Sequence, residues 1–397
     1  MKKFKAACAV LVVAFFITSC KKNISVETTQ DFSKTSSFKQ IASAIAPVVT
    51  INFDSLKATL PSTANARFKK STAFLLKQNP EFAEVIARAA NAVDAEPCST
   101  TPLNAWLNNQ LLDWDSEVYY YAILTGMLNL PTYDALYFEN TAGRKFYGVN
   151  GEHTQTYDKA FKDLKGFWNI QSDNMITVPI HGSMLQDRDK LIRVNKLLYG
   201  EDEANAAYWA DFTLWLLANV PQYRNGNHPV FSFNAYSQAS LDFYPFGTIP
   251  PKIALGDGII APYLDLGFGD VAPQAIFAHE YGHQVQFQNE VFSGGTADPE
   301  FTRRTELMAD GFAAYYLSHA RGASMQWKRV QQFLQVFYNL GDCYSNSYTH
   351  HGTPAQRMAV AEWGYRLADN AQKQGHVLTS SQFIELFDAS LPGIVGQ

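Results

Sequence analysis

The sequence predicts an α+β fold, and three observations along the chain support this prediction. Apolar residues recur at helical spacing between residues 37 and about 135, for example in Phe68 to Gln78 and Phe82 to Val93. Short apolar runs that are typical of strands then follow, at Met175 to Ile180, Val230 to Ala235, Lys252 to Leu255 and, more weakly, Pro262 to Leu266. From Asp270 onward the pattern is helical, with breaks rich in Gly and Ser. Strands grouped before a run of helices favour an α+β arrangement over alternating βα units.

Composition divides the chain into four parts. We expect a signal peptide at residues 1–19, a flexible tether at 20–36, a mostly helical region at 37–139 and the main α+β domain at 140–397. The tether is rich in Ser, Thr, Lys and Gln, as flexible linkers are.

The N-terminus has the features of an export signal. Three lysines precede an apolar run, Ala6 to Ile17, that is too short to span a bilayer comfortably. The run ends in Ile17-Thr18-Ser19-Cys20, which resembles the lipobox of bacterial lipoproteins. That resemblance implies cleavage before Cys20, a lipid on Cys20 and a membrane-anchored protein of the bacterial cell envelope, periplasmic or surface-exposed. The alternative is an ordinary signal peptide that happens to contain a cysteine.

Composition also excludes one class of partner. Charged residues make up only 17% of the chain, and the formal charge is −5. Because residues 1–19 hold three lysines and no acid, the chain from Cys20 onward carries about −8. No basic segment interleaves with aromatic residues, so we expect no nucleic-acid partner. Beyond the signal and Cys20, the remaining cysteines are Cys98 and Cys343, which can form one disulfide or remain two buried thiols.

The segment with the clearest chemistry is His279-Glu280-Tyr281-Gly282-His283, which has the pattern H-E-x-x-H. On a helix, His279 and His283 at i and i+4 project from one face, where two imidazoles can bind one zinc ion. Glu280 is displaced around the helix, where it can act as a general base on water without being a ligand. The alternative is an amphipathic helix with two hydrogen-bonded structural histidines.

A second acidic element follows 23 residues after His283, in Glu306-Leu307-Met308-Ala309-Asp310. Catalytic zinc commonly has three protein ligands and one open position. We therefore predict Glu306 as the third ligand and Asp310 as a hydrogen-bond partner that orients a ligand histidine. The alternative is a solvated acidic helix face, but the neighbouring Phe312 and Tyr316 are apolar.

Together these residues resemble a known group of enzymes. H-E-x-x-H followed by E-x-x-A-D is similar to the motif of the gluzincins. The amino-acid sequence from about residue 230 to 370 resembles that of the bacterial neutral zinc metallopeptidase family. The resemblance implies a zincin-like domain at 140–397 and extends to His351-Gly352-Thr353-Pro354-Ala355-Gln356-Arg357. It also implies that a histidine in this segment donates to the developing oxyanion and that Arg357 anchors the loop or a carboxylate. We expect His351 in the first role, although the doubled His350-His351 leaves open which of the two faces the metal. The alternative is a loop histidine without a catalytic part.

The sequence therefore predicts a zinc-dependent metallopeptidase with one Zn²⁺, a peptide or protein substrate and Glu280 as the general base. One alternative is a non-catalytic nutrient- or peptide-binding lipoprotein with an inert metal site. Another is a zinc hydrolase of a different amide, such as a cell-wall peptide. An intact Glu280 favours catalysis, because a structural zinc site needs no base and usually fills all four positions with protein ligands.

Overall fold

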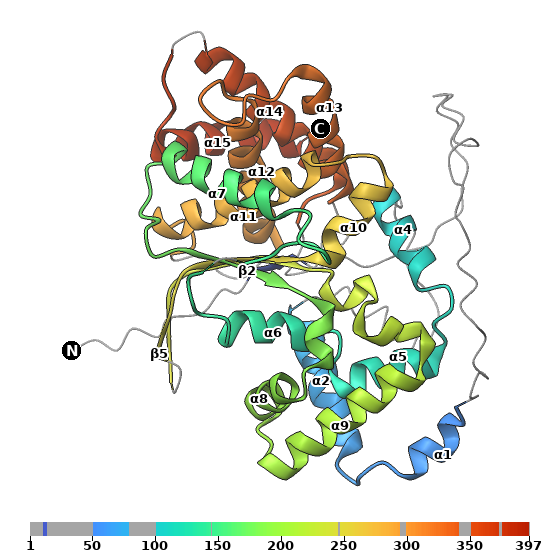
Figure 1. Ribbon diagram of the computed structural model, residues 1–397. Coiled ribbons are helices and arrows are strands. Elements are labelled where there is room, and N and C mark those ends of the chain that lie inside the picture. Colours follow the sequence, from blue (N-terminus) through green and yellow to red (C-terminus); the bar gives the residue numbers. More distant parts are fainter. Residues whose placement is uncertain are drawn as a thin grey trace.

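The computed structural model describes residues 11–13, 51–78, 101–143, 145–244, 247–293, 299–340, 351–372 and 375–396. Within these residues, helices predominate over a four-stranded mixed sheet and a two-stranded hairpin (Figure 1). This mixed architecture agrees with the α+β expectation. No helix of the described segments is both long enough and apolar enough to cross a bilayer.

The helical first third of the chain is confirmed where the structure describes it. Its helices are α1 (Phe53–Ala58), α2 (Ala64–Gln78), α4 (Pro102–Gln110), α5 (Ser116–Thr125) and α6 (Leu130–Tyr137). Local chemistry explains several of the boundaries. The Asp115 carboxylate caps α5 by accepting from the backbone amides of Glu117 and Val118, and Gly126 ends the helix at a φ of 79°. The run predicted at Phe82 to Val93 lies outside the described residues.

The sheet lies in the middle of the molecule and combines both strand directions. Its order is β1-β3-β6-β2, with β1 (Leu11–Val13), β3 (Ala235–Gln238), β6 (Lys252–Gly256) and β2 (Ile176–Ile180). Strands β2 and β6 are parallel, whereas β3 is antiparallel to both β6 and β1. Strands β4 (Leu241–Phe243) and β5 (Gly247–Ile249) form the separate hairpin.

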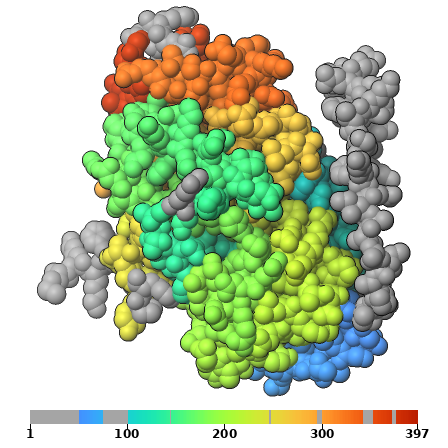
Figure 2. All heavy atoms as spheres, viewed as in Figure 1, coloured from blue at the N-terminus to red at the C-terminus, as the bar shows by residue number. Residues whose placement is uncertain are grey.

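Helices cover both faces of this sheet (Figure 1). On one side lie α7 (Thr154–Phe167) and α11 (Val271–Gln288); on the other lie α6, α8 (Arg188–Tyr199) and α9 (Glu203–Asn219). In the space-filling view, the green α7 segment lies above the yellow-green α8 and α9 segments (Figure 2). The orange and red C-terminal helices form the end of the molecule opposite α8 and α9. The C-terminal group comprises α12 (Pro299–Ser318), α13 (Trp327–Asn339), α14 (Pro354–Gln372) and α15 (Ser380–Val395).

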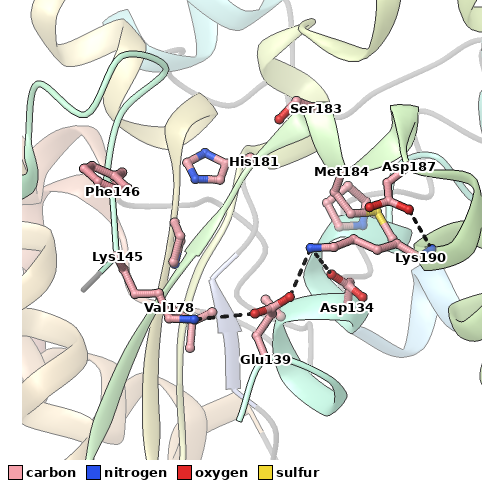
Figure 3. A pocket seen from close by; sticks show the side chains of 13 residues that line it. Asp134, Glu139, Lys145, Phe146, Val178, His181, Ser183, Met184, Asp187 and Lys190 are labelled. Carbon is pink, nitrogen blue, oxygen red and sulfur yellow. Dashed lines mark hydrogen bonds and ion pairs between the residues drawn. The ribbon is translucent and has the colours of Figure 1, made fainter. Parts of the chain in front are cut away.

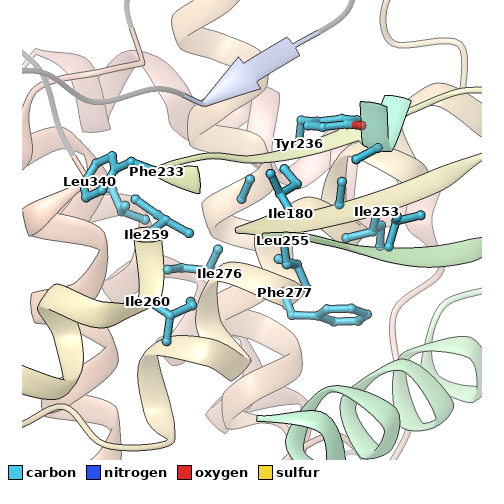
Figure 4. Close-up of a cluster of buried hydrophobic side chains, with 14 of the residues drawn as sticks. Ile180, Phe233, Tyr236, Ile253, Leu255, Ile259, Ile260, Ile276, Phe277 and Leu340 are labelled. Atoms are coloured by element: carbon cyan, nitrogen blue, oxygen red, sulfur yellow. The ribbon is translucent and has the colours of Figure 1, made fainter. Parts of the chain in front are cut away.

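Apolar side chains fix α11 against the sheet (Figure 4). Ile253 and Leu255 of β6 point toward Ile276 and Phe277 of α11, and all four are buried. Full burial of such a side chain stabilises the fold by roughly 1.5–3 kcal/mol. The helix therefore has a fixed position over β3 and β6, which matters because it carries the H-E-x-x-H residues.

A buried lysine fixes the other face of the sheet to α6. The ammonium of Lys252 lies 2.7–3.0 Å from the carbonyls of Ala135, Leu136 and Glu139 and from Oδ1 of Asn140. These acceptors lie at and just beyond the C-terminal end of α6, where a helix favours cations. Burial lowers the pKa of Lys252 to about 7.

Two strand predictions are wrong in detail. The residues Val230 to Ala235 form a 3₁₀ turn, η3 (Pro229–Ser232), and only Ala235 belongs to a strand. The His228 side chain caps this turn: its Nδ1 accepts from the Val230 amide (3.1 Å), and its Nε2 donates to the distant carbonyl of Gln110 (2.9 Å), which fixes the ring in place. The weaker run Pro262 to Leu266 lies mainly in helix α10 (Asp257–Asp265), where buried Ile259, Ile260 and Tyr263 recur at helical spacing.

Candidate metal centre

Helix α11 presents His279 and His283 on one face, as their i, i+4 spacing requires. Their Nε2 atoms lie 3.2 Å apart. The helix begins directly after Asp270, where the sequence pattern becomes helical. The Asp270 side chain does not cap the helix but contacts Gln274 and Arg329.

Helix α12 brings Glu306 to the two histidines. Its Oε2 lies 3.3 Å from Nε2 of His279, and its Oε1 lies 3.4 Å from Nε2 of His283. A close helix contact makes this possible. A Cβ at Gly282 would lie 3.1 Å from both Cα and the carbonyl oxygen of Ala309, so only glycine fits without a shift.

The three side chains offer lone pairs to one point. Nδ1 of His279 contacts an oxygen of Asp310 at 2.8 Å, and Nδ1 of His283 contacts Oε1 of Gln286 at 2.9 Å. Each of these oxygens acts as an acceptor, so each Nδ1 carries the proton in the neutral imidazole and each Nε2 presents a lone pair. Two imidazole lone pairs and a carboxylate thus converge, and the buried trio His279, His283 and Glu306 could hold a metal ion.

Asp310 orients His279 and is itself held by a buried arginine. Arg357, from the start of α14, donates Nε to Oδ2 and Nη2 to Oδ1 of Asp310, both at 2.6 Å, and Nη1 to the carbonyl of Leu340. Burial alone would lower the pKa of His279, but Asp310 and Glu306 outweigh it and raise that pKa to about 9. Of the two partners expected for Arg357, the loop or a carboxylate, the structure shows the carboxylate of Asp310; the further contact is with the Leu340 carbonyl at the C-terminal end of α13.

Glu280 lies beside the trio without contacting it through a hydrogen bond. Its side chain is 0% exposed, and neither carboxylate oxygen has a hydrogen-bond partner among the described residues. Burial raises the pKa of Glu280 to about 8. An unpaired carboxylate in such a place is costly unless it binds a proton, a water or a cation.

Comparison with family models, curated proteins and solved structures finds no match to the chain.

His351 lies close to the trio. The chain turns at Gly352 (φ 98°), which packs against Leu307 of α12, and His351 is buried beside it. Burial would raise the pKa of the Glu306 carboxyl, but His283 and His351 outweigh burial and hold that pKa well below its usual range. His350, Cys20, Cys98 and Cys343 lie outside the described residues.

Sequence reasoning missed Gln286, the partner of His283. Its amide nitrogen donates to the carbonyl of Thr305 at 2.6 Å. The sequence feature that could have indicated this role is a glutamine three residues after the second histidine, on a helix that is otherwise apolar enough to be buried.

A separate pocket of about 390 Å³ lies at the β2 edge of the sheet (Figure 3). Its charges are satisfied by one another: Lys190 lies between Glu139 (3.0 Å) and Asp134 (3.4 Å), and Lys145 reaches Glu139 from the other side (3.5 Å). His181 directly follows β2, and its Nδ1 lies 2.6 Å from Oδ2 of Asp257, outside the metal centre. These pairs connect α6 and α8, so the pocket is accounted for by structural ion pairing.

Proposed function

We propose that this chain is a zinc-dependent metallopeptidase with a zincin-like domain, related to the bacterial neutral zinc metallopeptidases and anchored in the cell envelope by a lipid on Cys20. The observation that carries the proposal is the convergence of three lone-pair donors next to an unpaired, buried Glu280. Acceptors do not gather at one point unless a cation or proton joins them.

The donor set and its spacing fit zinc. A tetrahedral ion with bonds of roughly 2.0–2.1 Å keeps its donor atoms roughly 3.3–3.4 Å apart. The two imidazole nitrogens lie 3.2 Å apart, close to that spacing, and the Glu306 carboxylate approaches His279 with one oxygen (3.3 Å) and His283 with the other (3.4 Å). Two imidazoles and one carboxylate suit zinc better than calcium or magnesium, which prefer oxygen ligands. Three protein ligands also leave one position free, as in catalytic zinc sites.

Each residue around the metal centre would then have a defined role in peptide hydrolysis. A bound zinc ion would supply Lewis acidity, acidifying a water and polarising the scissile carbonyl. Glu280 would take the proton from that water and deliver it to the leaving amine. His351 would donate to the developing oxyanion, while Asp310, held by Arg357, keeps His279 in the orientation that presents Nε2.

Strand β3 offers a place for an extended substrate. Residues Leu11–Val13 pair with its outer edge, in register Leu11 to Ser237 and Val13 to Ala235. These residues belong to the predicted signal peptide, and its removal would leave that edge unpaired. Gln284 of α11 donates to Oγ of Ser237, so the edge strand is joined directly to the metal helix. A peptide that adds to β3 as a strand would therefore lie along the helix of His279 and His283.

The competing function is a binding lipoprotein with an inert metal site. The complete enclosure of Glu280 and Glu306 in the described structure favours this alternative. A single experiment separates the two: metal analysis of the purified chain, followed by a peptide-library cleavage assay on wild type and Glu280→Gln. The substitution keeps the shape of the side chain but removes the base.

We expect one zinc per chain in both proteins and a fall in turnover of about 10²-fold or more in Glu280→Gln. Equal cleavage by the two zinc-loaded proteins would refute the mechanism. Zinc without any cleavage in the wild type would favour the binding function.

A further inference from the structure

Two glutamines on α11 are fully enclosed, and they differ in what they touch. Gln284 and Gln286 are 1% and 0% exposed. The amide of Gln284 donates to Oγ of Ser237 and to the carbonyls of Gln238 and Lys252, so it joins the helix to the sheet. The amide of Gln286 instead lies between His283 and Thr305.

The Thr305 carbonyl determines which way the Gln286 amide faces. A carbonyl oxygen can only accept, so the 2.6 Å contact requires the amide nitrogen of Gln286 on that side. The amide oxygen then faces Nδ1 of His283 at 2.9 Å. Because that oxygen also can only accept, Nδ1 of His283 must carry the proton, and its lone pair is on Nε2.

The same amide joins the two ligand-bearing helices. Thr305 immediately precedes Glu306 on α12, and His283 is on α11. One side chain therefore orients the second histidine and fixes the backbone beside the carboxylate, whose Oε1 lies 3.4 Å from Nε2 of His283. A neutral amide does this without another buried charge, whereas the Asp310 carboxylate beside His279 requires Arg357.

We infer that Gln286 is a positioning residue that selects the Nδ1–H tautomer of His283 and so directs Nε2 at the metal; this inference rests on the metal centre proposed above. Gln286 does not touch the substrate or the reacting atoms. Its effect should therefore appear in metal affinity, and Gln284 provides a matched control on the same helix.

The test uses the full chain with Zn²⁺ and Co²⁺ as probes. Affinity is measured by competition with a chelator, and thermal unfolding is followed on the metal-free proteins. Gln286→Met keeps the length of the side chain but removes both hydrogen bonds, and we expect affinity to fall about 10–100-fold. Gln284→Met should lower the unfolding temperature and leave the affinity at the wild-type value.

A second variant separates the acceptor from the donor. Gln286→Glu keeps an oxygen for Nδ1 of His283 but loses the donor to Thr305, so it should retain most of the affinity that Gln286→Met loses. Wild-type affinity in Gln286→Met, or an equal loss in Gln284→Met, would overturn the inference.

If Gln286→Met does not fold, nitrogen NMR of the zinc-loaded wild type decides the question. We expect His283 to bind through Nε2 with a proton on Nδ1, and binding through Nδ1 would overturn the inference. A wild-type chain that binds no metal would instead refute the proposed function itself.

Discussion

Replacing Gly282 by alanine tests whether helix packing sets the geometry of the metal centre. The new methyl group would lie 3.1 Å from Cα and from the carbonyl oxygen of Ala309. Carbon atoms in contact are normally about 3.5–4.0 Å apart. The obstacle is the backbone of a buried helix and not the end of a flexible side chain, so α11 and α12 must separate by a few tenths of an ångström.

A shift of this size is small for the fold but large for the site. Overpacking of a buried contact costs typically about 1–3 kcal/mol of stability. Metal–ligand distances tolerate only about ±0.2 Å, and the shift moves Glu306 away from both histidines at once. We therefore expect Gly282→Ala to fold with reduced stability and to bind zinc about 10–100-fold more weakly, a loss comparable with that of an outer hydrogen bond.

The assay is chelator competition for zinc together with unfolding of the metal-free protein, and Gly166 provides the control. A Cβ at Gly166, in α7, would meet nothing within 4 Å. Gly166→Ala should therefore stabilise that helix by roughly 0.5–1 kcal/mol and leave zinc affinity unchanged. If Gly282→Ala folds and binds zinc as tightly as the wild type, the helix contact does not set the ligand spacing.

Three further predictions address the remaining features. Asp310→Ala should weaken zinc affinity about 10–100-fold and should destabilise the chain, because Arg357 becomes an unpaired buried charge. The double variant with Arg357→Met should regain stability but not zinc affinity. Recovery of both would contradict the role of Asp310 in orienting His279. Cys20→Ala should release the protein from the membrane fraction or stall its processing, whereas fractionation and migration like wild type would exclude the lipid anchor. Burial lowers the pKa of His228 from 6.5 to about 4. As the pH falls, the His228 imidazole therefore binds a proton in the unfolded state before it does so in the folded state. About 3 kcal/mol of the free energy of unfolding should be lost between about pH 6.5 and 4. His228→Gln should flatten this part of the stability–pH curve, measured by denaturant unfolding, and an unchanged slope would assign the pH dependence to other groups.

The sequence predicted those parts of the site that depend on the period of a helix. His279 and His283 share a face because 3.6 residues make a turn, and Glu306 and Asp310 share a face for the same reason. That Asp310 bonds a ligand histidine followed from its position one turn beyond Glu306, and the structure shows this contact at 2.8 Å. Such inferences need only local geometry and the number of ligands that an ion requires.

Features that depend on how elements cross were not accessible in the same way. The partner of Arg357 lies 47 residues away on another helix. The role of Gln286 requires the Thr305 carbonyl, and that of Gly282 requires Ala309. Pro262 shows the same limit for secondary structure, because a short apolar run fits a strand or a helix until its packing partners are known.

The charges around the centre suggest why so many ionisable groups can be buried together. Asp310 is neutralised by Arg357, which contacts it through two nitrogens. Without a metal ion, the raised pKa values of His279 and Glu280 favour a charged His279 beside Glu306 and a protonated Glu280. Metal binding through Nε2 would require His279 to lose its proton, and Glu280 acting as a base would be ionised, so the remaining charges would then be the carboxylates of Glu280 and Glu306. Burying two unpaired carboxylates would cost several kcal/mol each. One divalent cation held by His279, His283 and Glu306 would balance both, whereas a monovalent ion would leave one negative charge unpaired. In the metal-bound state a divalent ion would therefore balance the two carboxylates, and this charge balance would connect Glu280 to the ion without making it a ligand.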